Sequence, residues 1–240
     1  MAAGAGDAGL AAALIVAAGS GERLRAGGPK ALVELAGRPM YEYSLEACRQ
    51  ASKVGQIVIA VPPGKAAAFG TATGAGSGVR IVEGGATRSH SVAAGLALID
   101  SATVIVHDAA RPLVTPGLID EAVTALEAAT GLDGVIAAAP VTDTIKRVGK
   151  DSRVSETLDR STLRAVQTPQ VFRRAALSAA IAAGDLDNAT DDASLVEAAG
   201  GAIAIMDSPS FNIKVTVPED IASAEAILAD RDRKDDPESC

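Results

Sequence analysis

Short runs of aliphatic and β-branched residues recur along the chain and are separated by segments long enough to form helices. The runs contain almost no polar positions, which is typical of strands that are buried on both faces of a parallel sheet. They predict strands over residues 12–16, 56–61, 79–82, 103–107, 134–139 and 202–206.

Between these runs, apolar residues recur at helical spacing, most clearly within residues 92–99, 118–126 and 221–228. Pro116 and Pro218 stand where two of the helices should begin, a position that tolerates the fixed φ and the missing N–H of proline. Alternation of strands and helices predicts an α/β fold, a three-layer sandwich of the Rossmann-like kind with a mostly parallel central sheet.

One polar segment, residues 141–164, interrupts this alternation and lacks a long apolar stripe. We interpret it as a β-ribbon arm that projects from the domain; the alternative is a surface hairpin without a role. Residues 1–229 are expected to form a single domain. Residues 230–240, DRDRKDDPESC, are a run of charges and are predicted to be a disordered tail.

Composition narrows the function classes. The chain has 48% hydrophobic, 22% charged and 2% aromatic residues, which is enough for a core built of small aliphatic side chains. A net charge of -8 and a pI near 4.8 oppose a nucleic-acid or anionic-membrane surface. The apolar run at residues 10–18 is shorter than a bilayer span, and no Lys or Arg precedes it as in a signal peptide.

Two distant cysteines, Cys48 and Cys240, suggest neither a disulfide framework nor a metal knuckle. A reducing, cytoplasmic location is therefore expected.

The first predicted strand runs into AAGSGERLRAGGPK, residues 17–30. Small residues at 17–21 would let backbone N–H groups approach an anion, and Arg23 and Lys30 add cations. The Walker pattern fails because Ala31 follows the lysine, and the Rossmann fingerprint fails because Leu24 replaces its third glycine. We predict a phosphate-binding loop of another kind, although a glycine-rich turn after a strand can also be purely structural.

The fourth predicted strand ends in VIVHDAARP, at the sheet edge where open α/β folds bind ligands. Asp108 there could hold Mg²⁺ or a ribose hydroxyl, or it could pair with Arg111 for structural reasons. His107 follows apolar residues and is interpreted as a hydrogen-bonded core histidine rather than a catalytic base.

Four further polar clusters each follow a predicted strand or precede a predicted helix: residues 84–91, 168–170, 190–194 and 212–216. Taken singly, they have structural explanations. Thr190 with Asp191 could be a helix N-cap, and Lys214 could be an exposed cation.

Taken in order, the motifs LIVAAGSGERL, VHDAARP, APVTDTIKR, LDRSTLRAVQTPQVF, TDDAS and FNIKVTVPED resemble the 2-C-methyl-D-erythritol 4-phosphate cytidylyltransferases of the non-mevalonate isoprenoid pathway. The resemblance covers residues 14–228. It implies a transferase that moves the cytidylyl group of CTP to that acceptor, with Mg²⁺ or another divalent cation and a homodimer joined through the arm.

The resemblance also implies roles for individual residues. Arg23 and Lys30 would be catalytic, and Asp108 would be the metal ligand. The nucleotide would contact Ala17, Ala18, Gly19, Ser20, Gly21, Gly84, Gly85, Arg88, Ser91 and Asp108. The acceptor would contact Arg160, Lys214, Thr190, Thr144 and Arg111, of which Thr144 and Arg111 would serve the neighbouring subunit's site.

The sequence departs from some relatives at Ala86, where they carry an acidic residue, so reading of the base would rest here on backbone groups. Three alternatives stay open. The first is a ribitol 5-phosphate cytidylyltransferase, because those enzymes look similar over the same motifs. A non-catalytic nucleotide-binding regulator is opposed by the retained cations, and a nicotinamide-dependent reductase by the absent third glycine.

Overall fold

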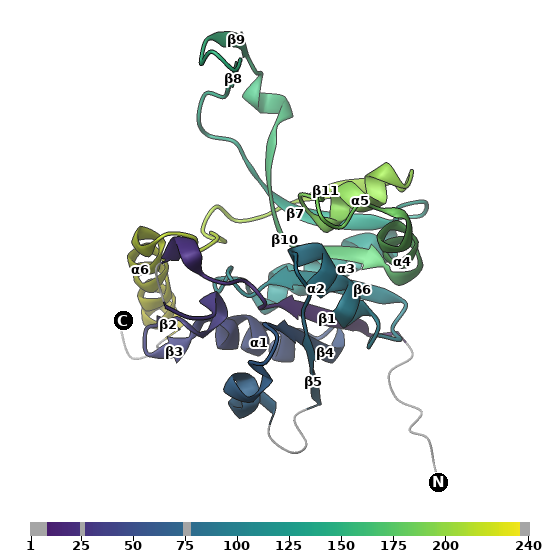
Figure 1. The fold of residues 1–240 in the computed structure, drawn as a ribbon, viewed down its shortest axis with the longest axis vertical. Coiled ribbons are helices and arrows are strands. Elements are labelled where there is room, and N and C mark those ends of the chain that lie inside the picture. Colours follow the sequence, from purple (N-terminus) through teal and green to yellow (C-terminus); the bar gives the residue numbers. More distant parts are fainter. Residues whose placement is uncertain (1–8, 25–26, 74–77, 236–240) are drawn as a thin grey trace.

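The structure is a computed structural model that describes residues 9–24, 27–73 and 78–235. Its centre is a seven-stranded sheet with the order β11-β7-β10-β6-β1-β4-β5 (Figure 1). The strands are β1 (Ala11–Val16), β4 (Val54–Val61), β5 (Val79–Glu83), β6 (Thr103–Asp108), β7 (Gly134–Pro140), β10 (Arg164–Arg173) and β11 (Ile203–Asp207).

Six of these strands match the predicted apolar runs, and they pair in parallel as expected, β1 with β4 and β6, β4 with β5, and β7 with β11. The exception is β10, which pairs antiparallel with both β6 and β7. Residues 168–170 were expected to follow a strand or precede a helix. That prediction is wrong, because they lie within strand β10. The strand has no apolar run at its centre, because Gln167, Thr168 and Gln170 are buried there and make hydrogen bonds with the side chains of distant residues.

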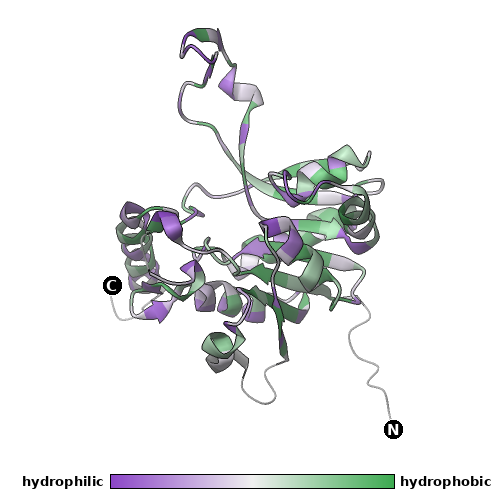
Figure 2. Cartoon of the chain, in the orientation of Figure 1, coloured by the Kyte–Doolittle hydropathy of each residue, from purple (hydrophilic) through white to green (hydrophobic). Residues whose placement is uncertain are grey.

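Helices cover both faces of the sheet, so the predicted three layers are confirmed. Alternate residues of β1 divide the core: Ala13 and Ile15 face α1 and α3, whereas Ala12 and Leu14 face α2, α4 and α5. Figure 2 shows mostly hydrophobic residues along the central strands. The helices are α1 (Met40–Gln50), α2 (Arg88–Leu96), α3 (Pro116–Ala128), α4 (Arg174–Ala183), α5 (Asp192–Ala198) and α6 (Pro218–Asp235).

Two short hairpins and four 3-10 turns complete the described chain. The hairpin of β2 (Glu34–Leu35) and β3 (Arg38–Pro39) precedes α1, and the 3-10 turns span Glu22–Leu24, Lys30–Leu32, Ala66–Thr73 and Arg160–Thr162. Pro116 and Pro218 begin α3 and α6, as predicted.

The predicted ribbon is present. Strands β8 (Lys146–Val148) and β9 (Val154–Thr157) pair antiparallel and form the outer part of an arm that stands clear of the sheet (Figure 1). All residues of both strands are exposed, among them Val148 and Val154. Val148 and Val154 pair with each other across the ribbon, so their exposed side chains lie side by side.

The prediction of a disordered tail from Asp230 is wrong for its first part, because α6 continues to Asp235. Asp230 accepts ion-pair contacts from Lys234 at 2.7 Å and Arg233 at 3.3 Å, one helical turn later. Such i,i+3 and i,i+4 pairs support a solvated helix end. Residues 236–240 lie outside the described part of the chain.

Candidate active site

The glycine-rich loop begins where β1 leaves the sheet. The backbone N–H of Ala17 donates to the carbonyl of Ala60, and the N–H of Lys30 returns to the carbonyl of Gly19 at 3.1 Å. Gly21 has φ of +77°, and a Cβ there would lie 2.8 Å from the carbonyl oxygen of Gly28. Only glycine fits this turn. The loop therefore folds back on itself and brings Lys30 next to Gly19.

A cavity of about 750 Å³ opens beside this loop, at the carboxyl edge of the parallel strands. Most of the predicted nucleotide-binding and catalytic residues line it, together with one predicted acceptor residue: Ala17, Ala18, Gly19, Ser20, Gly21, Arg23, Lys30, Gly85, Arg88, Ser91, Asp108 and Lys214. Gly84 does not line it but supports it, because a Cβ at Gly84 would lie 2.5 Å from the Ser91 hydroxyl.

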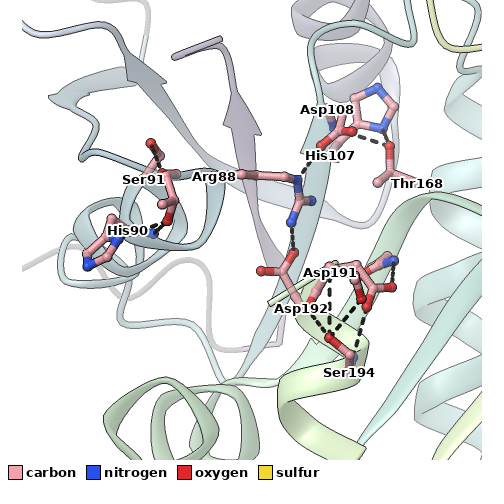
Figure 3. A network of polar contacts seen from close by, with 12 residues as sticks. Arg88, His90, Ser91, His107, Asp108, Thr168, Asp191, Asp192 and Ser194 are labelled. Carbon is pink, nitrogen blue, oxygen red and sulfur yellow. Dashed lines mark hydrogen bonds and ion pairs between the residues drawn. The ribbon is translucent and has the colours of Figure 1, made fainter. Parts of the chain in front are cut away.

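Asp108 ends β6 and lies between two cations. Its Oδ1 accepts a hydrogen bond from Arg88 Nε at 2.8 Å, and its Oδ2 accepts one from Lys214 Nζ at 2.6 Å (Figure 3 shows the Arg88 contact). Burial opposes its ionisation, but the charges of Arg88 and Lys214 outweigh burial and hold the pKa of Asp108 well below its usual range. The carboxylate is therefore ionised, and the structural pairing with Arg111 that the sequence left open is replaced by these two partners.

Lys30 lines the same cavity. Burial, followed by the positive charges of Lys214 and Arg23, lowers the pKa of Lys30 to about 8. Lys30, Lys214, Arg23 and Arg88 all line this cavity, and the neighbouring charges of Lys214 and Arg23 make it less favourable for Lys30 to stay charged. Such a cluster is stabilised by a polyanion, so the cavity is electrostatically suited to a triphosphate.

His107 is a core histidine, as interpreted from the sequence. It is fully buried; its Nε2 lies 3.2 Å from the carbonyl oxygen of Arg111 and its Nδ1 lies 3.0 Å from the hydroxyl of Thr168 (Figure 3). Burial lowers the pKa of His107 to about 4. Both ring nitrogens are occupied, so the histidine positions the residues around Asp108 and has no free nitrogen for a substrate.

A second cavity of about 410 Å³ adjoins the first. Arg88, Asp108 and Lys214 line both cavities and form the wall between them. Thr190 and Arg111, two predicted acceptor residues, line the second cavity. The N-cap of α5 is Asp191, whose carboxylate accepts from the N–H of Ser194 at 2.9 Å, so the capping role suggested for this cluster is real, and Thr190 is left at the cavity.

The remaining predicted acceptor residues are not brought to either cavity within one chain. Thr144 lies on the arm, and Arg160 lies in the 3-10 turn Arg160–Thr162 between β9 and β10, where its Nη1 donates to the carbonyl of Thr142. Neither residue lines the two cavities.

Among the residues that the sequence analysis did not single out, two make hydrogen bonds that shape this site. Asp192 accepts a hydrogen bond from Arg88 Nη1 at 2.6 Å, and Asn212 donates from Nδ2 to the carbonyl of Thr168 at 2.9 Å. Both belong to motifs that the sequence had singled out, TDDAS and NIKVT. Their side chains point inward, and no local pattern tells an inward polar residue from an exposed one.

Metal-ligating groups are sparse. Within residues 9–24, 27–73 and 78–235, no cluster of three or more His, Cys, Asp or Glu side chains could hold a metal ion unaided. In the same part of the chain, no helix is long and apolar enough to cross a membrane.

Comparisons with known proteins identify the family of the chain. The family model described as 2-C-methyl-D-erythritol 4-phosphate cytidylyltransferase matches residues 11–230. The enzyme so named from Frankia casuarinae is 46% identical over 95% of this chain and 85% of its own length, and that from Rubrobacter xylanophilus is 43% identical over 93% and 97%.

A solved structure supports the fold independently. The 4-diphosphocytidyl-2C-methyl-D-erythritol synthase of Anaerococcus prevotii superposes with a TM-score of 0.79 and 28% identity, covering 93% of this chain and all of that one. With a family match that spans nearly the whole described chain, this protein belongs to the 2-C-methyl-D-erythritol 4-phosphate cytidylyltransferase family.

Proposed function

We propose that this chain transfers the cytidylyl group of CTP to 2-C-methyl-D-erythritol 4-phosphate, giving 4-diphosphocytidyl-2-C-methyl-D-erythritol and pyrophosphate. The observation that carries the proposal is the shared wall of two cavities, in which Arg88, Asp108 and Lys214 contact both spaces. A nucleotide in the first cavity and an acceptor phosphate in the second would meet at this wall.

The chemistry needs alignment and charge neutralisation. A phosphate oxygen of the acceptor forms a bond to the α-phosphorus of CTP while the bond from that phosphorus to the bridging oxygen breaks, and pyrophosphate leaves. The acceptor phosphate is already anionic near neutral pH, so no side chain has to remove a proton. This agrees with a site lined by several cations, in which His107 is fully buried and hydrogen-bonded through both ring nitrogens.

The residues of this chain would act on charge and position. Residues 17–21 of the loop, together with Arg23 and Lys30, line the cavity that would take the triphosphate. Fixed cations that match the charge of the transition state are the largest contribution expected in phosphoryl transfer. Lys214, which lines both cavities, would hold the acceptor phosphate beside the α-phosphorus.

A divalent cation would fit between a carboxylate of this chain and the phosphates of the substrate. Asp108 is ionised, and each of its oxygens accepts one hydrogen bond from a cation, which leaves lone pairs available. Mg²⁺ is commonly held by one or two carboxylates together with substrate phosphates. Asp108 would therefore hold Mg²⁺ with the phosphates of CTP, and the ion would neutralise charge on those phosphates when bound.

The arm supports the proposal of a homodimer. Its exposed valines, Val148 and Val154, have no cover within the chain, and it carries Thr144 and Arg160, which reach neither cavity of their own chain. A second copy would cover the valines and bring arm residues to an acceptor site.

The cytoplasm is the proposed location. The reaction joins two phosphorylated metabolites, and Cys48 is free and buried, both of which agree with that compartment.

The test is release of pyrophosphate from CTP with 2-C-methyl-D-erythritol 4-phosphate, with the product mass determined. We expect turnover that needs a divalent cation and stops in excess chelator. Turnover with ribitol 5-phosphate in preference would assign a different acceptor, and binding of CTP without turnover of either acceptor would make the protein a non-catalytic nucleotide binder.

A further inference from the structure

Arg88 begins α2 and contacts two carboxylates from distant parts of the chain. Its Nε donates to Asp108 Oδ1 at 2.8 Å, and its Nη1 donates to Asp192 Oδ2 at 2.6 Å. Figure 3 shows the guanidinium lying between the two carboxylates. One side chain thus joins the end of β6 to the start of α5.

The contacts form an alternating row of charges, Asp192, Arg88, Asp108 and Lys214. The last three line both cavities, whereas Asp192 lines neither and is fully buried. Asp192 is therefore the inner end of the row, and it is the one member with no access to a substrate.

Capping of α5 does not explain Asp192. The N-cap is Asp191, which closes a capping box with Ser194. Asp192 Oδ1 is buried and has no hydrogen-bond partner in the described structure. Burial raises the pKa of Asp192 although the charge of Arg88 opposes the rise. An ionisable group with one unpaired oxygen is a costly way to fill space, because an apolar side chain would avoid the desolvation.

The cost is explained if the carboxylate is needed by Arg88. A long side chain with one partner can rotate about several bonds, whereas two ion pairs on different nitrogen atoms fix the plane of the guanidinium. We propose that Asp192 is a positioning residue, which fixes the Arg88 guanidinium so that Asp108 and Lys214 keep their places in the wall between the two cavities. The inference rests on the proposed function, which assigns CTP and the acceptor to those cavities.

The proposal predicts which kinetic constants change when Asp192 is substituted. Asp192→Asn keeps the size of the side chain and removes its charge, so Arg88 loses its inner ion pair and the shared wall loosens. The KM values for CTP and for the acceptor should both rise. Loss of a group that orients a binding residue typically costs about 10–100-fold, and we expect a fall of that size in kcat/KM.

Asp120→Asn is a matched control. Asp120 lies on α3 and accepts from the backbone N–H groups of Ser52 and Lys53, both at 2.9 Å, before β4 begins and thus at the sheet edge opposite the cavities. The control should lower the melting temperature and leave both KM values unchanged. If Asp192→Asn behaved in the same way, its role would be merely structural and the proposal would be overturned.

A double substitution tests the route through Arg88. In an Arg88→Met background, Asp192→Asn should cause no further loss of kcat/KM, because Asp192 acts through the guanidinium that is already absent. Full, multiplicative losses from the two changes would overturn the proposal.

Calorimetric titration of CTP into the same proteins separates this inference from the proposed function. If the wild-type chain bound CTP but turned over neither acceptor, the proposed function would fail. Weaker CTP binding by Asp192→Asn than by wild type would still support the positioning role, and equal binding would oppose it.

Discussion

Arg111 Nη1 donates a hydrogen bond of 2.7 Å to the backbone carbonyl of Asn212, and so joins the loop after β6 to the segment that leads to Lys214. Its Nη2 donates to the carbonyl of Val166 at 3.3 Å, and Arg111 is only 9% exposed. The guanidinium therefore braces the Lys214 segment of its own chain. A contact with a neighbouring subunit's acceptor stays a prediction for this residue.

Asn212→Ala should loosen the Lys214 segment. The Asn212 amide is fully buried and donates to the carbonyl of Thr168 at 2.9 Å and to Gln167 Oε1 at 3.0 Å. Removal leaves a buried carbonyl without this donor, which costs about 1–3 kcal/mol. Urea unfolding should show that loss, and the acceptor KM should rise. Ser223→Ala, on the exposed side of α6, should change neither; an unchanged acceptor KM in Asn212→Ala would show that Lys214 is held by other contacts.

Gly95→Ala should destabilise the core between α2 and β1. A Cβ at Gly95 would lie 2.2 Å from Leu14 Cδ1, and Leu14 is itself fully buried. Overpacking of this kind costs about 1–3 kcal/mol. Gly117→Ala is the control, because a Cβ there meets nothing within 4 Å on α3. It should leave the free energy of unfolding unchanged or raise it by up to about 1 kcal/mol. Equal effects of the two changes would contradict the close contact.

The central parallel strands β1, β4, β6 and β7 could be predicted from the sequence because most of their residues are buried, so that each reads as an apolar run. Strand β10 could not be predicted in this way. Its buried centre carries Gln167, Thr168 and Gln170, whose side chains make hydrogen bonds with Ser208, His107 and Asp191 respectively. Those partners are distant in sequence, so the strand has neither a continuous apolar run nor a simple alternation.

The same distinction separates the site residues. Arg23 and Lys30 lie on one loop, and their link to a phosphate site follows from local spacing. The pairing of Asp108 with Lys214 spans 106 residues, and that of Arg88 with Asp192 spans 104. Such contacts exist only once the sheet order is set. Without the fold, Asp108 could equally be paired with the nearby Arg111, which the structure shows bonded to backbone carbonyls instead.

Lys30→Ala and Arg23→Ala should lower kcat far more than they weaken CTP binding. Charge on the transferring group peaks in the transition state, and loss of one stabilising donor typically costs about 10²–10³-fold in kcat. Steady-state rates of pyrophosphate release provide the measurement. Lys65→Ala, which removes an exposed lysine after β4, is the control and should keep the wild-type rate. A near-normal kcat in either test variant would make that residue a structural cation.

The pH dependence of kcat/KM for CTP should follow the protonation of Lys30. Burial and the neighbouring charges of Lys214 and Arg23 place the pKa of Lys30 at about 8, so the side chain is cationic below that pH and neutral above it. Since the cation is the active form, kcat/KM for CTP should fall as pH rises through 8. Rates between about pH 6.5 and 9.5 test this, and Lys30→Arg should remove the fall because arginine stays protonated. An identical fall of kcat/KM in Lys30→Arg would show that another group causes the loss of activity at high pH.

Arg160→Lys should impair the enzyme although it preserves the charge. Arg160 lies in the 3-10 turn between β9 and β10, and its Nη1 donates to the carbonyl of Thr142 across the root of the arm. That bond ties the guanidinium to the root of the arm, and its other N–H groups would bind the acceptor phosphate that the proposed function assigns to it. A lysine offers a point charge where a planar fork can bind two oxygens, and it cannot hold the arm and the phosphate together.

The acceptor phosphate would then be held loosely and out of line with the α-phosphorus, so the acceptor KM should rise and kcat should fall. The CTP KM should change little, because the nucleotide cavity is built from the glycine-rich loop and residues 85–91. Kinetics with each substrate varied in turn provide the measurement. Arg153→Lys, an equally exposed change near the tip of the arm, should leave all three constants unchanged. A large rise in the CTP KM alone would instead place Arg160 in the nucleotide site, since a residue that binds only the acceptor has no means of weakening CTP.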